Sequence, residues 1–138
     1  MSVLAFIEKN WMLVTVALAS GAMLVWPLVQ RRFSPVKDLG TLGATQLLNR
    51  DALLLDVRET NEYEQGRVPN ALHIPLSQLA QRIGEVKGRH DQPVIVYCAS
   101  GRRSRTAGAT LAKAGFKDIY HLSGGIAAWR GAGLPLEK

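Results

Sequence analysis

The pattern of apolar and polar residues divides the chain into a long uncharged segment and a region of short alternating elements. Residues 11–29 form an uncharged run of nineteen residues, WMLVTVALASGAMLVWPLV. As a helix this run is about 29 Å long, which matches the roughly 30 Å hydrocarbon core of a bilayer. Trp11 and Trp26 lie towards its two ends, as aromatic residues do at membrane interfaces. The pattern predicts a transmembrane helix at 11–29, preceded by a short segment at 1–10 and followed by a tether at 30–36.

The apolar run also fits a signal peptide or a buried core helix. Ala17-Leu18-Ala19 matches a small-x-small cleavage site, which would make the run a signal peptide. The apolar stretch before that site has only about six residues, however, the charges of Glu8 and Lys9 cancel, and the hydrophobicity continues beyond the site. A buried core helix would need a partner surface from a domain whose own pattern is complete. We therefore expect an uncleaved anchor.

Flanking charges predict the orientation of this anchor. Lys9 and the N-terminal amine precede the run, whereas Arg31, Arg32 and Lys37 follow it. Because basic residues favour the cytoplasmic side, we expect a single-pass protein of the inner membrane whose C-terminal domain faces the cytoplasm. The single cysteine agrees with this expectation, since one cysteine forms no intramolecular disulfide and the cytoplasm is reducing.

Short apolar segments alternate with helical patterns over residues 37–136, the expected domain. Such alternation predicts an α/β fold with a parallel sheet and helices on both of its faces. Thr41 is the expected N-cap of the first helix of this domain. The expected strands are 36–39, 52–57, 70–73, 94–97 and 116–121, and the expected helices are 42–48, 60–65, 77–83, 104–114 and 124–129, with a polar loop at 84–92.

The apolar strand expected at 94–97 leads into the segment that carries the candidate chemistry. Cys98 stands at the junction of this strand with a polar loop, and a helix is expected directly after the loop. A loop that curls from a strand into a helix N-terminus turns its N–H groups inward and adds the positive end of the helix dipole. A thiol there has a lowered pKa and is a nucleophile at neutral pH. The alternative is an inert buried thiol, because free cysteine often acts as a small hydrophobic residue.

Three groups of residues resemble the motifs of single-domain rhodanese-type sulfurtransferases. The first is the loop CASGRRS at 98–104. The second comprises LLDVRE at 54–59, EYEQG at 62–66 and VPNALHIPL at 68–76, and the third comprises LSGGI at 122–126, AW at 128–129 and GLP at 133–135. The resemblance covers about residues 37–136 and implies a rhodanese-like fold, a parallel sheet with helices on both faces.

The resemblance also implies a mechanism, ping-pong sulfur transfer. The Cys98 thiolate would take the outer sulfur of a small anionic donor, thiosulfate or a persulfide, and pass it to a thiol or to cyanide. The N–H groups from Ala99 to Ser104 would hold the anionic persulfide, as an oxyanion hole holds charge. Arg103, and secondarily Arg102, would attract the anionic end of the donor. The candidate substrate-binding residues are Ala99, Ser100, Gly101, Arg102, Arg103 and Ser104.

Two charged residues and two histidines each have a functional and a structural interpretation. Asp56 and Arg58 lie at or just beyond the C-terminal end of the strand predicted at 52–57 and by resemblance frame the pocket. We favour a structural role, in which they pair with each other or with a carboxylate such as Glu62. His73 and His121 are candidate bases, yet their apolar surroundings favour hydrogen-bonded structural roles.

Several classes of partner are not indicated. The formal charge of +6 comes from 17 basic and 11 acidic residues that are scattered along the sequence, without the basic stripe or reader motif of a nucleic-acid-binding protein. The three histidines, His73, His90 and His121, lie far apart, so no metal site is expected, and no organic cofactor is called for. The expected partners are the donor, the acceptor, the lipid bilayer and, as a further option, membrane or sulfur-relay proteins.

Two rival functions remain open. Tyrosine-phosphatase-type sites place five residues between the cysteine and the phosphate-binding arginine, whereas only four residues separate Cys98 from Arg103. The loop therefore forms a smaller ring, which suits a sulfur atom better than a phosphoryl group. The other rival is a membrane-anchored interaction or redox-sensing module with little turnover, in which Cys98 has no catalytic role. The intact loop from Cys98 to Arg103 favours chemistry, because a pure scaffold does not need it.

Overall fold

The computed structural model describes residues 2–87 and 91–138, without the side chains of residues 31–33 and 87. The chain divides into two compact units, Met1–Ser34 and Pro35–Lys138. Some features on which the sequence-based expectations depend lie outside the described residues: the N-terminal amine, the side chains of Arg31 and Arg32, and His90 with part of the loop at 84–92.

The first unit consists of two helices. Helix α1 (Val3–Lys9) begins at Ser2, whose hydroxyl accepts a hydrogen bond from the Ala5 N–H, and Asn10 separates it from α2 (Trp11–Phe33). Residues 11–30 of α2 have a mean hydropathy of 2.0 and are long and apolar enough to cross a membrane. No residue of this apolar window is buried, whereas the core helix of a soluble protein is mostly buried. The helix continues beyond Pro27 into the segment predicted to be a tether.

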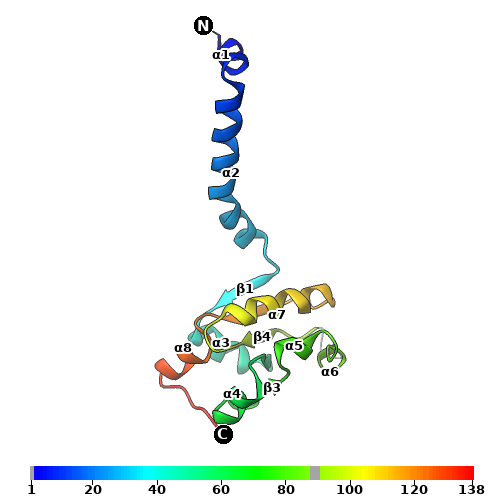
Figure 1. Cartoon of the computed structure of the whole chain (residues 1–138). Helices are drawn as coiled ribbons and strands as arrows, with labels where there is room; N and C mark the ends of the chain where they lie inside the picture. Colours follow the sequence, from blue (N-terminus) through cyan, green and yellow to red (C-terminus); the bar gives the residue numbers. More distant parts are fainter. Residues whose placement is uncertain (1, 88–90) are drawn as a thin grey trace. The chain divides into compact units, whose positions relative to one another are not determined.

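The second unit is built on a five-stranded parallel sheet (Figure 1). Its strand order is β1-β5-β4-β2-β3, and every pairing within it is parallel. The all-parallel sheet confirms the predicted α/β class. The strands are β1 (Val36–Leu39), β2 (Leu53–Asp56), β3 (Leu72–His73), β4 (Val94–Tyr97) and β5 (Ile119–Leu122).

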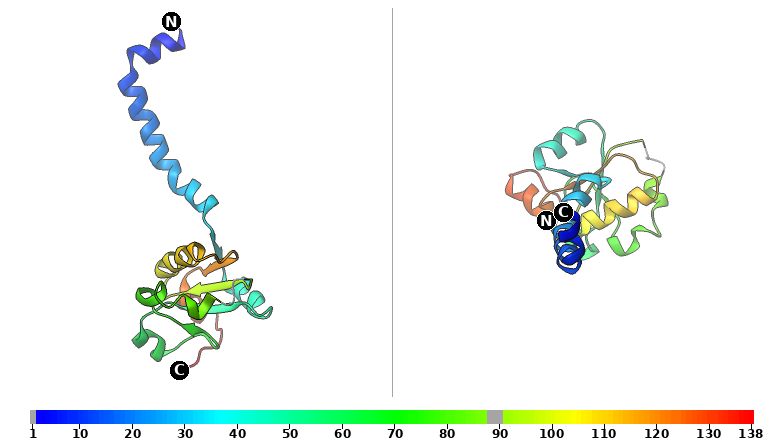
Figure 2. Two further views of the ribbon diagram at one scale, coloured as in Figure 1. Left: turned by 90° about the vertical axis from the view of Figure 1, so that its right-hand side faces the viewer. Right: turned by 90° about the horizontal axis from the view of Figure 1, so that it is seen from above.

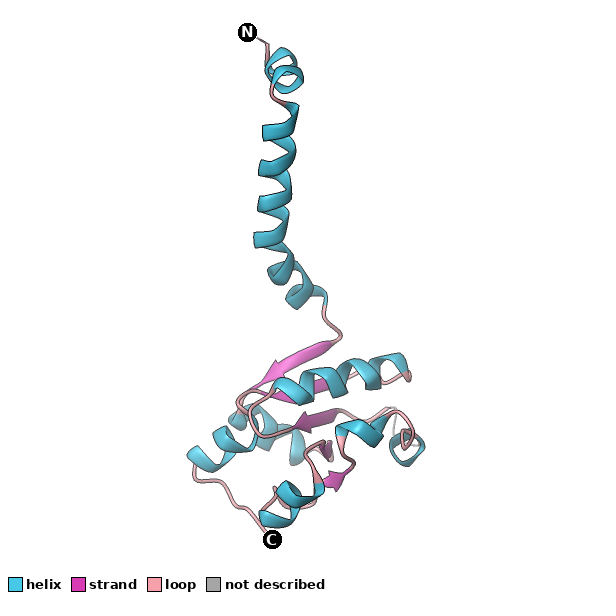
Figure 3. Cartoon of the chain, viewed as in Figure 1, coloured by secondary structure: helices cyan, strands magenta, loops and turns pink. Residues whose placement is uncertain are grey.

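Helices cover both faces of this sheet, and Figure 3 distinguishes them from the strands by colour. Alternating residues of β4 enter two separate apolar clusters, Val94 and Val96 in one and Ile95 and Tyr97 in the other. In the right-hand view of Figure 2 the yellow α7 and the red α8 lie on opposite sides of the strands. The helices of this unit are α3 (Thr41–Leu48), α4 (Thr60–Gln65), α5 (Leu76–Leu79), α6 (Gly84–Lys87), α7 (Arg102–Lys113) and α8 (Gly125–Gly131).

Several helix boundaries differ from the predicted ones. Gly40, not Thr41, is the N-cap of α3, because its extended backbone precedes the first helical residue and Thr41 already lies in the helix. Helix α6 occupies part of the predicted polar loop, where the buried side chain of Val86 fixes a helical turn. Helix α7 begins at Arg102 rather than at 104, because the left-handed Gly101 ends the loop earlier.

Candidate active site

Cys98 lies at the carboxyl edge of the sheet, directly after β4. Tyr97 and Asp56, the last residues of β4 and β2, are register partners, so both strands end at the same level. Ligands of open α/β sheets bind outside this edge. Gly101 has a φ of +110°, a conformation that suits glycine, and there its N–H donates a hydrogen bond to Cys98 Sγ at 3.0 Å.

The loop lowers the pKa of the Cys98 thiol. The residue is only 1% exposed, and burial by itself raises the pKa of a thiol. The N–H groups of Ser104, Gly101 and Ser100, together with the Ser104 hydroxyl, outweigh this effect by stabilising the thiolate. The result is a thiol whose pKa lies below its ordinary value, as a nucleophile requires.

Helix α8 is hydrogen-bonded to the first residues of this loop. The Ile126 N–H donates to the Cys98 carbonyl at 2.9 Å, and the Ala127 N–H donates to the Ala99 carbonyl at 3.4 Å. Gly125 has a φ of +59°, and a Cβ on it would lie 2.3 Å from the Cys98 carbonyl oxygen. The close approach therefore depends on glycine. The place of Gly125 at the start of a helix could be predicted from the sequence, but its contact with the loop could not.

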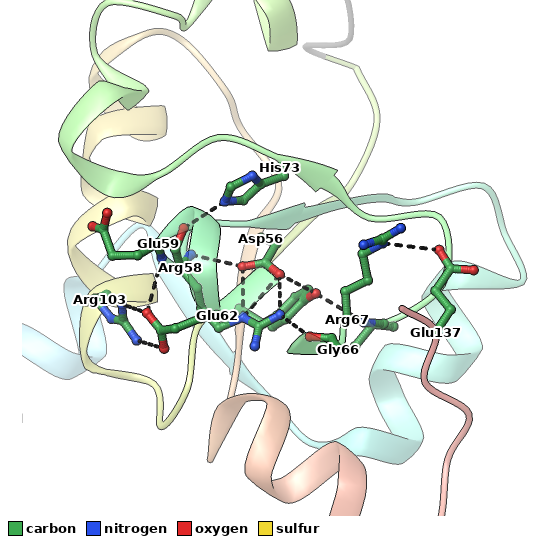
Figure 4. A network of polar contacts seen from close by, with 11 residues as sticks. Asp56, Arg58, Glu59, Glu62, Gly66, Arg67, His73, Arg103 and Glu137 are labelled. Atoms are coloured by element: carbon green, nitrogen blue, oxygen red, sulfur yellow. Dashed lines mark hydrogen bonds and ion pairs between the residues drawn. The ribbon is translucent and has the colours of Figure 1, made fainter. Parts of the chain in front are cut away.

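The guanidinium of Arg103 is paired with Glu62 of α4 rather than open to solvent (Figure 4). Its Nη1 and Nη2 lie 2.6 and 2.9 Å from the two carboxylate oxygens, and both side chains are about one-third exposed. The hydrogen bond from Arg103 holds the pKa of Glu62 at about 2. Glu62 also accepts a hydrogen bond from the Glu59 N–H in a capping box, so α4 fixes its position. Arg102 is exposed.

Asp56 and Arg58 form a buried ion pair that fixes the turn after β2 (Figure 4). Arg58 Nη2 lies 2.7 Å from Asp56 Oδ2 and also donates to the Gly66 carbonyl at 2.7 Å. The Tyr97 hydroxyl donates to the same carboxylate oxygen at 2.6 Å and accepts from the Val68 N–H. Burial opposes the charge of Arg58, but the Asp56 carboxylate raises the pKa of Arg58 above its ordinary value. Of the two pairings expected for these residues, the structure shows the one with each other, since Glu62 pairs with Arg103.

His73 and His121, the two histidines that the structure describes, differ in whether they contact the Cys98 loop. His73 Nε2 is bonded to the Arg58 carbonyl at 2.8 Å and its ring stacks on Tyr63, which is a structural role. His121 is also hydrogen-bonded, but one partner is the Ser104 hydroxyl of the Cys98 loop. Within residues 2–87 and 91–138, no group of three or more His, Cys, Asp or Glu side chains is placed to hold a metal ion.

A cavity of about 200 Å³ adjoins the Cys98 loop. A larger cavity of about 800 Å³ includes residues that precede β2 and β4, such as Asp51 and Gln92, and therefore lies at the opposite edge of the sheet. Of these two cavities, the smaller one adjoins the Cys98 loop, through Ala99. It is lined by Arg58, Glu62, Gln65, Gly66, Ala99, Ile126 and Arg130.

Comparison with known proteins assigns the fold and the loop to one family. The family model described as "Rhodanese-like domain" matches residues 43–132. The chain belongs to the rhodanese-like family. A rhodanese-related protein from Thermoplasma volcanium has a similar solved structure, with a TM-score of 0.66 and 28% identity, covering 73% of this chain and 97% of the other.

Named relatives of this rhodanese-like chain include one with a stated activity. The thiosulfate sulfurtransferase GlpE of Coxiella burnetii is 37% identical over 95 residues, which is 68% of this chain and 87% of GlpE. The uncharacterized protein YqhL of Bacillus subtilis is 50% identical over 82 residues, which is 59% of this chain and 64% of YqhL. The similarity therefore covers the domain that contains Cys98, and it includes relatives with and without a stated activity.

Proposed function

We propose that this rhodanese-like protein is a sulfurtransferase that carries a sulfane sulfur on Cys98. The observation that carries the proposal is the hydrogen bond from the Gly101 N–H to Cys98 Sγ at 3.0 Å, within a loop that lowers the pKa of the thiol. The same N–H groups would stabilise the anionic outer sulfur of a persulfide. The activity named for GlpE supports thiosulfate as a donor to test.

Sulfur transfer on Cys98 takes two displacement steps. The Cys98 thiolate attacks the outer sulfur of thiosulfate, the bond between the two sulfur atoms of the donor breaks, and sulfite leaves with the electron pair. In the second step cyanide attacks the outer sulfur of the Cys98 persulfide, which forms thiocyanate and returns the thiolate. A thiolate acceptor would take the same sulfur as its own persulfide. Neither step consumes or releases a proton beyond the ionisation of the thiols.

The ion pair between Arg103 and Glu62 is the part of the site that an anionic donor would change. Arg103 lies in the first turn of α7, and Glu62 and, to a smaller extent, a Cys98 thiolate raise the pKa of its guanidinium. Cys98 is nearly covered, so a donor reaches Sγ only when a neighbouring group moves. We assign this movement to Arg103, which exchanges the Glu62 carboxylate for the sulfonate end of thiosulfate. The exchange replaces one anionic partner of the guanidinium by another, so Arg103 remains paired with a negative charge.

Helix α2 anchors the protein in the inner membrane in this proposal, with the domain in the cytoplasm. The support is the length and hydropathy of residues 11–30 and the excess of basic residues after them. In spheroplasts of a bacterial host, external protease should leave the domain intact, and it should degrade the domain once the membrane is permeabilised. Degradation without permeabilisation would contradict the orientation, and recovery of the chain in the soluble fraction would contradict the anchor.

A turnover assay tests the proposed activity. The full chain in mild detergent is given thiosulfate and cyanide, and thiocyanate is measured against the Cys98→Ser variant. Because Cys98 is the only cysteine, the variant lacks every candidate nucleophile of this type. Turnover that is lost in the variant supports the sulfurtransferase. Absence of turnover with thiosulfate and with persulfide donors would contradict it and favour the anchored interaction or redox-sensing module.

A further inference from the structure

Asp38 and His121 lie opposite each other on the neighbouring parallel strands β1 and β5. The two residues are register partners, and His121 Nε2 contacts Asp38 Oδ1. Side chains alternate along a strand, so His121 shares the sheet face of Ile119, which packs in the cluster beneath α7. This face brings the imidazole of His121, which is 3% exposed, against the first turn of α7.

The hydroxyl of Ser104 joins His121 to Cys98. Ser104 is fully buried, and its Oγ lies 3.2 Å from His121 Nδ1 and 3.7 Å from Cys98 Sγ. The single hydrogen of the hydroxyl is donated to the Gly101 carbonyl at 2.9 Å. Its oxygen therefore accepts a hydrogen bond from the Cys98 thiol and is hydrogen-bonded to Nδ1 of His121, whose role as donor or acceptor depends on the ring tautomer.

Three groups hold the His121 ring. The Asp38 carboxylate can only accept, so the ring nitrogen Nε2 donates to it. Arg105 Nη2 donates to the same carboxylate oxygen at 3.2 Å and so holds Asp38 beside the ring. The backbone of Gly101 packs against the ring, since a Cβ on this glycine would lie 3.7 Å from His121 Cε1.

We propose that His121, held by Asp38, is a positioning residue that acts on Cys98 through the hydroxyl of Ser104. The inference rests on the proposed function, because it concerns the same nucleophile. When Cys98 ionises, its proton passes to solvent and the sulfur can no longer donate. The Ser104 hydroxyl then turns its hydrogen from the Gly101 carbonyl to the thiolate. The contact of His121 Nδ1 with Oγ keeps this oxygen in place during the exchange, so the thiolate gains a hydrogen bond of fixed geometry.

The test measures the pH profile of Cys98 alkylation in the full chain in detergent. Iodoacetamide reports this residue alone, because the chain has one cysteine. Since a hydrogen bond to a charged group contributes about 1.5–3 kcal/mol, Ser104→Ala should raise the apparent pKa of Cys98 by about one unit or more. His121→Leu should raise it by about half a unit or more. His121→Asn, whose amide keeps a polar group beside Oγ, should restore most of the wild-type profile.

A double variant separates positioning from charge. In the Ser104→Ala background, His121→Leu should shift the profile no further, because the hydroxyl through which the ring acts is gone. A direct charge effect of the ring or of Asp38, Arg103 or Arg105 on the thiolate would persist in that background. Ile119→Val, a buried apolar change on the same strand that removes no hydrogen bond, is the control and should leave the profile unchanged. An unshifted profile in His121→Leu, or the same shift with and without the hydroxyl, would overturn the inference.

A measurement on the unmutated chain covers the case in which His121→Leu does not fold. Nitrogen-15 NMR of the histidine rings is recorded before and after Cys98 is blocked. The Nδ1 signal of His121 should shift, whereas the signals of His73, which bonds to the Arg58 carbonyl, should not. An unmoved His121 signal would overturn the inference. Alkylation needs no sulfur transfer, so a chain without turnover that shows these shifts would contradict only the proposed function.

Discussion

Replacement of Gly125 by alanine tests the contact between α8 and the Cys98 loop. Gly125 has a φ of +59°, and left-handed backbone costs an L-residue with a side chain roughly 1–2 kcal/mol. The new Cβ would also lie 2.3 Å from the Cys98 carbonyl oxygen and 2.7 Å from the Ala99 carbonyl carbon. Both neighbours are backbone atoms, so relief requires the loop or the helix to move.

The size of the effect follows from these two contributions. Separation of the Cβ from the carbonyl oxygen to an ordinary contact distance of 3.4–4 Å stretches the Ile126 N–H to Cys98 C=O hydrogen bond, now 2.9 Å long. Overpacking of this kind costs about 1–3 kcal/mol. We expect Gly125→Ala to lower the free energy of unfolding by about 2–5 kcal/mol, which corresponds to a fall in Tm of roughly 10–30 °C for a domain of this size.

Gly131→Ala is the matched control for this experiment. Gly131 belongs to the same helix, its φ is not positive, and nothing lies within 4 Å of its Cβ position. Alanine there should therefore leave the stability unchanged or raise it by up to about 1 kcal/mol. Calorimetry of both variants of the full chain gives the comparison. A Tm of Gly125→Ala within about 2 °C of the control would refute the reasoning, because about 2 °C corresponds to less than 1 kcal/mol.

Three further predictions concern the charges around the loop. Asp56→Asn leaves a buried guanidinium without its counter-charge, so it should destabilise the domain by about 3 kcal/mol, measured by thermal unfolding; an unchanged Tm would contradict a structural role for the pair. Arg103→Gln should raise the KM for thiosulfate about tenfold with a smaller effect on kcat, and Glu62→Gln, which frees the guanidinium, should lower this KM. Arg82→Gln breaks another ion pair, the one with Glu85, and should leave both kinetic constants unchanged. Equal effects in all three variants would contradict the proposed exchange. The alkylation of Cys98 should have its midpoint below that of a free thiol measured under the same conditions, because the loop lowers the pKa of the Cys98 thiol. Since folding lowers this pKa, the thiolate should add stability at high pH that is lost as the pH falls through the midpoint, and a midpoint above that of a free thiol would contradict the role of the loop.

The strands and the place of Cys98 could be predicted because their signals are local. β-Branched and aromatic residues at 94–97 identify a buried strand, and the polar loop that follows identifies the position of Cys98. The lowered pKa of its thiol follows from the same local geometry, a loop entering a helix N-terminus. Helix α6 was not predicted because it lies in a polar segment and only one buried residue, Val86, fixes it.

The partners of the site residues could not be predicted because they depend on tertiary placement. Arg103 meets Glu62 across 41 residues of sequence, and the position of Glu62 is set by the packing of α4. His121 meets Asp38 across 83 residues, through a register between β1 and β5 that no local pattern specifies. The alternation of side chains along β5 places His121 on the same face as Ile119, below α7. It does not predict the contact of His121 with Ser104.

Intact mass after brief exposure to thiosulfate tests the central claim most directly. The full chain has one cysteine, so a covalent sulfur can be attributed to Cys98 without mapping. The account predicts that the wild type gains the mass of one sulfur atom, that cyanide removes it, and that Cys98→Ser gains nothing. A wild-type chain that gains no sulfur from thiosulfate or from a persulfide donor, or a gain that persists in Cys98→Ser, would contradict the account.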